Sequence, residues 1–257
     1  MRLSVFASGS DGNSLAVGTG PTTLVVDLGL SCRQLECRMR SCGVEPDSVD
    51  AVLFTHDHSD HCCALEVFHR HHPQIPLLAT DGTAGAIAMR TGVEDGWTAF
   101  ETGGEFTIGD ISVETFSVPH VAADPVGYLF SSGGVSLFVA TDFGTVTESV
   151  RQAFRRADCA VLESNHDPEL LAQSGRPPSL KQRISGRSGH LSNDDACELL
   201  RTVRPPNLRT LFLAHLSQEC NEPHLAVRAM KEAAAGIGMP AMRVEALCQD
   251  DVLCCDF

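Results

Sequence analysis

The chain has 257 residues, of which 43% are hydrophobic and 20% are charged, as in ordinary globular proteins. Its formal net charge of −14 excludes a surface coated with positive potential, although divalent cations and a local basic segment can still dominate the field inside a cleft. No apolar run is long enough to span a bilayer and no signal-peptide core is present, so we expect a cytoplasmic protein with eleven reduced cysteines and no membrane partner.

The first third of the chain alternates short apolar runs with glycine-containing turns, which is typical of a β-sheet interrupted by helices. Strands are predicted at Leu3–Phe6, Ser14–Val17, Thr23–Val26, Ala51–Phe54 and Ile75–Ala79. Helices are predicted near Cys32–Cys42, Ala64–His71 and Thr83–Thr91.

The rest of the chain repeats this pattern. Strands are predicted at Phe106–Ile108, Ile111–Val118, Val126–Phe130, Ser136–Ala140, Cys159–Leu162, Thr210–Ala214 and Arg243–Leu247. Helices are predicted near Val146–Arg156, Leu180–Ile184, Asp194–Val203 and Leu225–Ala235. Sheet-rich stretches with helices at intervals predict two packed sheets covered by helices. Because low-complexity linkers are absent, we expect one domain over residues 1–257.

The strongest chemical signal is the run Thr-His-Asp-His-Ser-Asp-His at residues 55–61, which begins where a predicted buried strand ends. Side chains two residues apart share a face of an extended chain, so His56 and His58 point the same way. Asp60 and His61 can turn toward a second, nearby point. Imidazoles with a carboxylate suit zinc or a similar ion, and so many ionisable groups are costly to hold together without a cation. The run therefore predicts a metal site.

Three later residues stand at the ends of predicted strands, namely His120, Asp142 and His215. Each of them alone is more often a structural residue than a ligand. Together, at strand ends that hold side chains rigidly, they favour a catalytic centre. The sequence thus predicts two divalent metal ions, with zinc and manganese both compatible with the ligand types.

The H-x-H-x-D-H run, its later partners and Asp27 at the end of an early strand resemble the metallo-β-lactamase superfamily. The resemblance implies an α+β fold, a four-layer αββα sandwich, which agrees with the predicted elements. It assigns His56, His58 and His120 to one metal, Asp60, His61 and His215 to the other, and Asp142 to both. It also implies that Asp27 supports the histidine loop.

Further strings narrow the resemblance to one branch of the superfamily. The segments at residues 8–13, 163–167, 180–184, 189–193 and 214–217 resemble the YycJ/WalJ-like group, which is related to ribonuclease Z and to the ribonuclease J type nucleases. Members of this group are taken to be 5′-to-3′ DNA exonucleases linked to mismatch repair. The resemblance therefore implies nucleic acid as the partner, with DNA preferred over RNA.

The residues also fit phosphodiester hydrolysis on chemical grounds. Two neighbouring metal ions can activate a water molecule and neutralise phosphate oxygens. Asp60 is predicted to orient that water, and His190, paired with Glu163, to protonate the leaving oxygen. Phosphate contacts are predicted for the basic residues Lys181, Arg183 and Arg187, which follow Arg176 in one short segment, and for Ser10 and Asn13 on the first turn.

Alternative functions remain open at this point. The same metals could serve a small cyclic phosphodiester, and nothing in the sequence decides against it. Thioester or lactam chemistry is disfavoured by the Glu163–His190 pair and the basic segment before it. A non-catalytic metal-binding scaffold is disfavoured because a scaffold needs no complete acid–base set.

Overall fold

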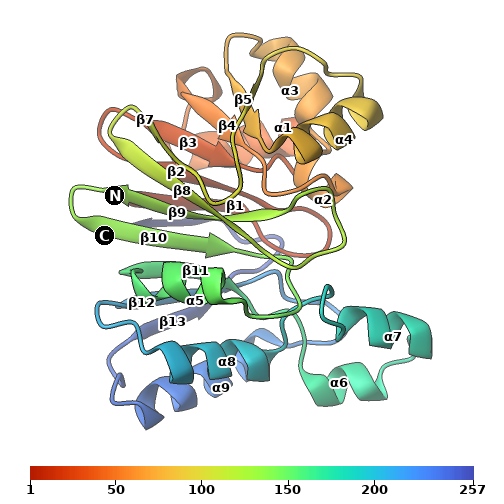
Figure 1. Cartoon of the computed structure of the whole chain (residues 1–257), viewed down its shortest axis with the longest axis vertical. Helices are drawn as coiled ribbons and strands as arrows, with labels where there is room; N and C mark the ends of the chain where they lie inside the picture. The colour runs from red at the N-terminus through yellow and green to blue at the C-terminus, as the bar shows by residue number, and fades with distance from the viewer.

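The computed structural model describes residues 1–257 and contains two mixed β-sheets that pack face to face (Figure 1). The first sheet consists, in spatial order, of β14 (Leu253–Asp256), β1 (Arg2–Ala7), β2 (Ser14–Gly18), β3 (Thr23–Val26), β4 (Ala51–Leu53), β5 (Leu77–Ala79) and β6 (Trp97–Ala99). The second consists of β13 (Arg243–Ala246), β12 (Thr210–Ala214), β11 (Cys159–Glu163), β10 (Val135–Ala140), β9 (Val126–Ser132), β8 (Ile111–Ser117) and β7 (Glu105–Ile108).

Helices cover the outer face of each sheet (Figure 1). The first sheet is covered by α1 (Cys32–Ser41), α3 (Leu65–His71) and α4 (Asp81–Thr91), with the 3₁₀ turn η1 (Pro46–Ser48) between α1 and β4. The second is covered by α5 (Glu148–Arg155), α8 (Asn193–Val203) and α9 (Pro223–Gly236). Short α2 (Ser59–Cys62) follows β4, while α6 (Pro168–Gln173) and α7 (Pro178–Ile184) project from the side of the molecule. None of these helices combines the length and apolarity needed to cross a membrane.

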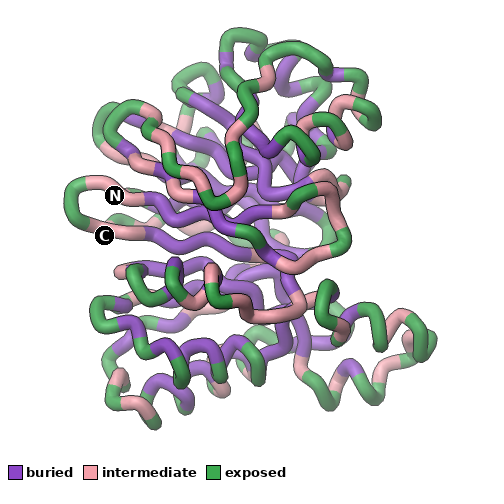
Figure 2. Tube along the Cα trace, viewed as in Figure 1, coloured by how far each residue is buried: buried purple, intermediate pink, exposed green.

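Alternation along the strands explains the layers. In β3, Leu24 and Val26 point into the core between the sheets, whereas Val25 points toward the helices of the first sheet. In β12, Phe212 faces the core between the sheets and Leu213 faces the helices of the second sheet. Central strands are therefore buried on both faces, as the tube coloured by burial shows (Figure 2). This arrangement confirms the predicted four-layer sandwich.

The elements that the sequence did not predict are short and lie at the periphery. β6 and β14 are edge strands of three and four residues with partly exposed side chains, so they lack a clear apolar pattern. α6 has six residues, and its only clear signal is the capping side chain of Asp167 before Pro168. All eleven cysteines are free, and six of them are buried, which agrees with the predicted reduced thiols that pack in the core.

Candidate metal centre

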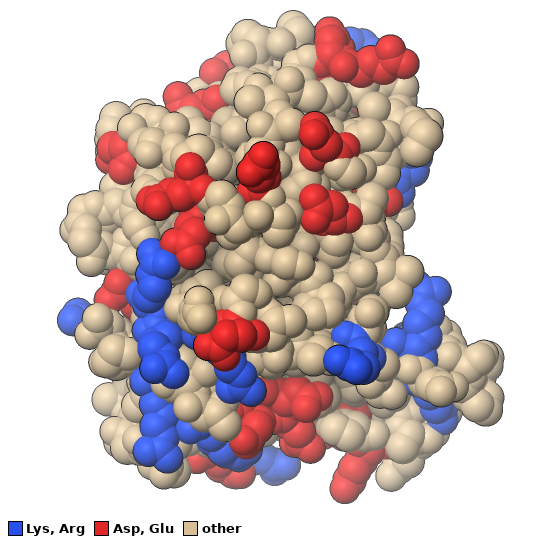
Figure 3. All heavy atoms as spheres, in the orientation of Figure 1, with Lys and Arg blue, Asp and Glu red and all other residues tan.

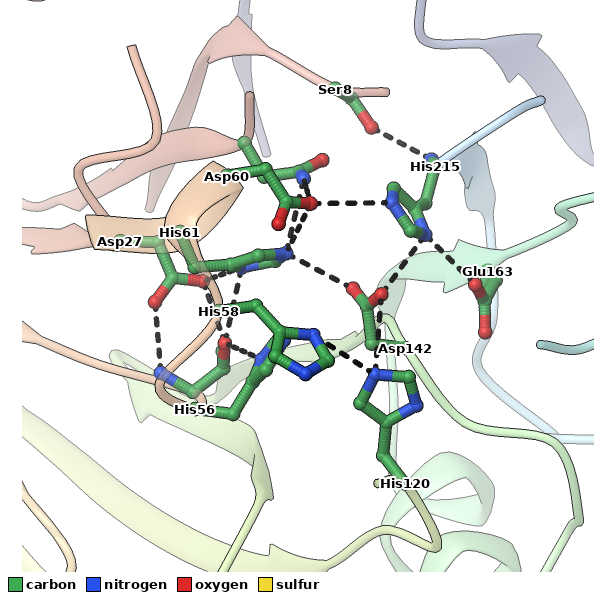
Figure 4. A network of polar contacts seen from close by, with 12 residues as sticks. Ser8, Asp27, His56, His58, Asp60, His61, His120, Asp142, Glu163 and His215 are labelled. Atoms are coloured by element: carbon green, nitrogen blue, oxygen red, sulfur yellow. Dashed lines mark hydrogen bonds and ion pairs between the residues drawn. The ribbon is translucent and has the colours of Figure 1, made fainter. Parts of the chain in front are cut away.

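The predicted ligands meet at one edge of the sandwich, where strands of both sheets end (Figure 4). Asp27 follows β3 and His56 lies just beyond β4, while Asp142 and His215 follow β10 and β12. β3 pairs with β4 in parallel, and β10, β11 and β12 pair in parallel, so their carboxyl ends reach the same edge. The topology thus brings together residues that are far apart in the chain: Asp27 and His215 are separated by 188 positions.

Three of these residues turn the chain sharply as it leaves its strand. Asp27, Asp142 and His215 have positive φ angles of 61°, 58° and 55°. This left-handed region is uncommon for residues other than glycine, and holding a residue in it costs on the order of 1–3 kcal/mol. The surrounding packing maintains the strained turns, which direct all three side chains into the site.

One group of metal donors consists of three histidines. One ligand nitrogen from each of His56, His58 and His120 lies within 4.8 Å of the other two, and His58 Nδ1 is 3.3 Å from His120 Nε2. The remaining ring nitrogens are occupied, because His58 Nε2 donates to the Val121 carbonyl and His120 Nδ1 donates to the Gly189 carbonyl. His56 Nε2 is buried and has no hydrogen-bond partner. These tautomers leave three lone pairs facing one point.

A second group lies on the other side of Asp142. His61 Nε2 and His215 Nε2 are 3.5 Å and 3.9 Å from Asp60 Oδ2, and His215 Nε2 is a second buried nitrogen without a hydrogen bond. Asp142 faces both groups, with Oδ2 3.2 Å from His61 Nε2 and Oδ1 3.9 Å from His120 Nε2. Unpartnered buried nitrogens beside carboxylate oxygens are what a divalent cation site requires.

The electrostatics of the two groups agree with metal binding. Burial and the neighbouring His61 hold the pKa of His56 well below its usual value, so its imidazole is neutral. Burial alone would raise the pKa of Asp142, but the surrounding histidines, His215 and His61 above all, hold it well below the usual range. Burial alone would lower the pKa of His61, but the carboxylates of Asp27 and Asp142 outweigh burial and raise this pKa well above its usual value. The His61 imidazole would therefore release its proton on binding a metal, because ligands bind as neutral imidazoles and ionised carboxylates. The donor set therefore fits divalent ions.

Asp27 holds the loop that carries the first ligands. Its Oδ2 lies 2.8 Å from His61 Nδ1 and accepts a hydrogen bond from Thr55 Oγ1, and its Oδ1 accepts one from the Thr55 backbone N–H. Asn13 Nδ2 approaches from the first turn, 3.1 Å from His61 Nε2 and 3.4 Å from Asp60 Oδ2. Asn13 is thus placed against the ligands rather than exposed for a phosphate contact.

Glu163, the last residue of β11, supports ligands from the second sheet as Asp27 supports those from the first. Its Oε1 lies 2.8 Å from His190 Nδ1 and 2.9 Å from His215 Nδ1, and its Oε2 accepts hydrogen bonds from the backbone N–H groups of Phe143 and Leu191. The predicted Glu163–His190 contact is present. With both oxygens engaged in this way, Glu163 is a positioning group rather than a metal ligand.

His190 remains protonated in this environment. Burial alone would lower its pKa, but the carboxylates of Glu163 and Asp142 outweigh burial and raise the pKa to about 9. The pKa of Glu163 is lowered, since its contact with His190 outweighs the effect of burial. A charged imidazolium at neutral pH can donate a proton to a leaving group.

A polar pocket of about 200 Å³ opens over these residues, and Arg176 and Arg183 lie in its wall together with Ser10. Arg183 forms no ion pair, whereas Arg176 Nε is 2.8 Å from a carboxylate oxygen of Glu219. The other three predicted phosphate contacts, Lys181, Arg187 and Asn13, are not in this wall. Lys181 Nζ donates to the Ala172 carbonyl, and the Arg187 carbonyl accepts a hydrogen bond from Thr145 Oγ1.

Lys and Arg side chains on the visible face also lie beside the hollow between the body and the α6–α7 projection, whereas acidic side chains are scattered over the first half (Figure 3). Arg176 and Arg183 lie in the pocket wall together with the carboxylates of Asp60 and Asp142, so cationic side chains reach the site although the net charge of the chain is −14.

A buried amide network supports the ligand loops and was not predicted from the sequence. Asn193 Nδ2 donates to Asn221 Oδ1, and Asn221 Nδ2 donates to the Ser164 carbonyl. Asn165 Nδ2 donates to the His215 carbonyl at 2.8 Å. Asn165 and Asn193 lie within the segments that carried the family resemblance, so a signal was present for them, but only the fold reveals their contacts.

Two glycines allow the loops to approach closely. A Cβ on Gly29 would lie 1.8 Å from the Asp60 carbonyl oxygen and 2.4 Å from the Asn13 nitrogen. A Cβ on Gly144 would lie 2.6 Å from the Gly189 nitrogen, beside His190. Both contacts are far inside van der Waals distance, so larger residues would displace the loops that carry the ligands.

Comparisons with known proteins bear on this site. The family model described as "Beta-lactamase superfamily domain" matches residues 22–216. The chain is 36% identical over 244 residues to "Exodeoxyribonuclease YycJ" of Bacillus anthracis, covering 93% of this chain and 92% of that protein. It is 35% identical over 246 residues to "Exodeoxyribonuclease WalJ" of Streptococcus pneumoniae, covering 93% and 91%.

Among solved structures, the fold is similar to that of the metallo-beta-lactamase fold protein YhfI from Bacillus subtilis. The TM-score is 0.74 at 16% sequence identity, and the match covers 98% of each chain. At this identity the likeness concerns the fold alone, and it agrees with the two packed sheets and their covering helices.

Proposed function

Because this chain belongs to the metallo-β-lactamase superfamily and is a hydrolase of that fold, we propose that it is a metal-dependent phosphodiesterase that cleaves nucleic acid. The observation that carries the proposal is a single pocket that joins three kinds of group. These are two sets of metal donors, a histidine–carboxylate pair and arginine side chains. Each kind matches one requirement of phosphodiester hydrolysis.

The proposed assignment of metal donors follows the one that the family resemblance implies. His56, His58 and His120 would hold one divalent ion, Asp60, His61 and His215 would hold the other, and Asp142 would contact both. Bound in this way, zinc or manganese would supply Lewis-acid activation of water and neutralisation of phosphate oxygens. Asp27 and Thr55 keep the histidines of the first half oriented.

The chain's own residues account for the proton transfers. Asp60 is only partly buried and lines the pocket, so its carboxylate can orient the attacking water by accepting a hydrogen bond. His190 also lines the pocket, with Nδ1 held by Glu163 and its other ring nitrogen free of protein hydrogen bonds. That free nitrogen, carrying a proton at neutral pH, donates it to the leaving oxygen.

Substrate binding is assigned to Arg183 and Arg176, with Ser10 as a further phosphate contact. Arg183 is unpaired in a pocket whose wall is almost entirely polar, so an anion would satisfy it. Contacts to backbone phosphates bind without sequence preference. Lys181 and Asn13 already make side-chain hydrogen bonds within the protein, which gives their predicted phosphate roles less support, whereas the role of Arg187 stays a prediction.

DNA is the proposed substrate, because both curated relatives named above are exodeoxyribonucleases that match along nearly their whole length. A 5′-to-3′ direction is the one that the family resemblance implies. The alternative of a small cyclic phosphodiester uses the same metals and the same proton donor, and differs only in needing no extended phosphate-binding surface.

The test is a cleavage assay with the same sequence as single- and double-stranded DNA and as RNA, labelled at the 5′ or the 3′ end. Manganese and zinc are supplied separately. Asp60→Asn is the inactive variant, and Asp81→Asn, an exposed carboxylate on α4, is the matched control. We expect stepwise shortening of DNA from its 5′ end by the wild type and the control, and none by Asp60→Asn.

A result in which RNA is cut and DNA is not would contradict the DNA assignment. If bis(p-nitrophenyl) phosphate is hydrolysed in an Asp60-dependent way while no oligonucleotide is cut, the small-phosphodiester alternative replaces the nuclease proposal. If no phosphodiester of any size is hydrolysed with either metal, the phosphodiesterase proposal itself fails.

A further inference from the structure

A second cluster of metal-binding side chains lies outside the catalytic pocket, where α1 contacts the end of α3 (Figure 1). Ligand atoms of Cys32, Glu36 and His71 lie within 4.8 Å of one another. Cys32 and Glu36 are one turn apart on α1, so they share a face, and His71 is the last residue of α3. None of these residues contacts the catalytic ligands.

Glu36 Oε1 is the centre of this cluster. It lies 3.3 Å from Cys32 Sγ, 3.4 Å from His71 Nδ1 and 3.5 Å from Nε2 of His72. A tetrahedral zinc ion with bonds of about 2.0–2.3 Å has ligand atoms about 3.3–3.8 Å apart. These three separations from Glu36 match three edges of such a tetrahedron; the mutual cluster within 4.8 Å comprises Cys32, Glu36 and His71, and His72 joins it through Glu36.

His72 supplies an independent sign of a missing ligand. Its side chain is 8% exposed, and Nε2 is buried without a hydrogen bond although it points at Glu36. The other nitrogen, Nδ1, is 2.7 Å from a carboxylate oxygen of Asp47. A carboxylate that fixes the outer nitrogen of a histidine and leaves the inner one free is the usual support for a zinc-binding imidazole.

We propose that Cys32, Glu36, His71 and His72 form a structural zinc site that joins α3 to α1. The donor set of one thiolate, two imidazoles and one carboxylate suits zinc better than manganese or magnesium, which prefer oxygen ligands. Arg40 contacts the outer oxygen Oε2 of Glu36 at 3.2 Å and keeps Oε1 directed inward. His71, with a half-exposed side chain, is the ligand through which the ion enters.

The site has a spectroscopic signature that the catalytic centre lacks. All proposed catalytic ligands bind through nitrogen or oxygen, whereas this site includes a thiolate. Cobalt(II) replaces zinc in such sites, and a cobalt–thiolate bond gives a charge-transfer band in the near ultraviolet. Only the site on α1 and α3 should produce this band, whether or not the catalytic centre is also loaded.

The experiment is a cobalt(II) titration of the chelator-treated full chain, followed by absorbance, for the wild type, Cys32→Ser and Cys37→Ser. Cys37 is exposed on the same helix and outside the proposed ligand set, so it is the matched control. We expect a saturable band in the wild type and in Cys37→Ser, no band in Cys32→Ser, and unchanged nuclease activity in both variants. A wild type without the band at saturation, or a band that persists in Cys32→Ser, would overturn the proposal.

Two further variants keep the test decisive if Cys32→Ser folds poorly. His71→Ala removes a surface ligand, and Asp47→Asn removes the support of His72. Losing such a support typically weakens metal binding about 10–100-fold, so Asp47→Asn should shift the cobalt titration by that factor. We also expect zinc to raise the Tm of the wild type more than that of His71→Ala. Equal zinc effects on both proteins would contradict the assignment.

Discussion

The two halves of the catalytic site are each held by one buried carboxylate, but the two carboxylates do different work. Asp27 supports a continuous loop in which four metal donors lie within six residues, and it contacts His61 and Thr55. Glu163 instead joins residues from separate strands and loops, because it contacts both His190 and His215.

Asp27 therefore bears only on metal binding, whereas Glu163 also bears on the proposed proton transfer. Asp27 fixes ligands only, so its effect on the reaction passes through the metal. Glu163 fixes one ligand and also keeps a proton on a histidine that is not in either proposed ligand set. Under the proposed function the second half of the molecule would couple metal binding to acid catalysis, so variants of the two carboxylates should give different kinetic signatures.

The largest expected effect is at Asp142, the one residue that faces both halves. Asp142→Ala removes a proposed donor from both metal groups and leaves His56, His58 and His120 facing one another without a carboxylate. We expect cleavage of DNA to fall to the level of a metal-free blank, with the bound metal per chain reduced. Retention of full metal content and activity would contradict its assignment to both groups.

The next effect is at His190. His190→Gln should lower kcat by about 10²–10⁴-fold, which is the usual contribution of a general acid, while the bound metal per chain stays unchanged. The measurement pairs steady-state kinetics with metal analysis. A substrate with a leaving group that needs no proton, such as p-nitrophenolate, should restore most of the lost rate. A variant that loses its metals together with its activity would show His190 to be a ligand instead.

A direct comparison of Glu163→Gln with Asp27→Asn sharpens the contrast in pH dependence. The pKa of His190 is raised to about 9, so the acid stays protonated at neutral pH and loses its proton as the pH rises through that value. In the wild type kcat should therefore fall above about pH 9. Glu163→Gln removes the main charge that raises this pKa, so the fall should begin at lower pH.

Asp27→Asn is the matched variant on the other side. It should weaken metal binding about 10–100-fold without moving the alkaline limb of the profile, because Asp27 does not contact His190. If the alkaline fall of kcat shifts by the same amount in both variants, it reflects a group at the metals and not the titration of His190.

The smallest effects concern substrate binding. Arg183→Ala should weaken DNA binding and reduce the slope of log K against log salt by about one. Lys181→Ala should have less effect, since its ammonium group already donates to the Ala172 carbonyl. Fluorescence anisotropy with a labelled oligonucleotide at several salt concentrations measures both. An equal change in the two variants would indicate that the α7 surface binds DNA as a whole, without a specific contact in the pocket.

Much of this protein was determined by local sequence. The run at residues 55–61 places four proposed donors on one loop, and the continuous apolar runs of β3 and β12 give strands that are buried on both faces. These patterns, with the isolated His120, Asp142 and His215, predicted packed sheets and a metal centre, and the family resemblance that they carry implied the four-layer fold.

Tertiary structure decided the contacts that join distant segments. The double role of Glu163, the placement of Arg176 in the pocket wall and the cluster of Cys32 with His71 and His72 depend on chain segments whose sequence separation carries no distance information. The left-handed turns at Asp27, Asp142 and His215 likewise could not be predicted locally, because aspartate and histidine adopt this conformation more often than most residues but still only rarely. Only the packing of the loops around the site holds these turns, and they direct the ligands to one place.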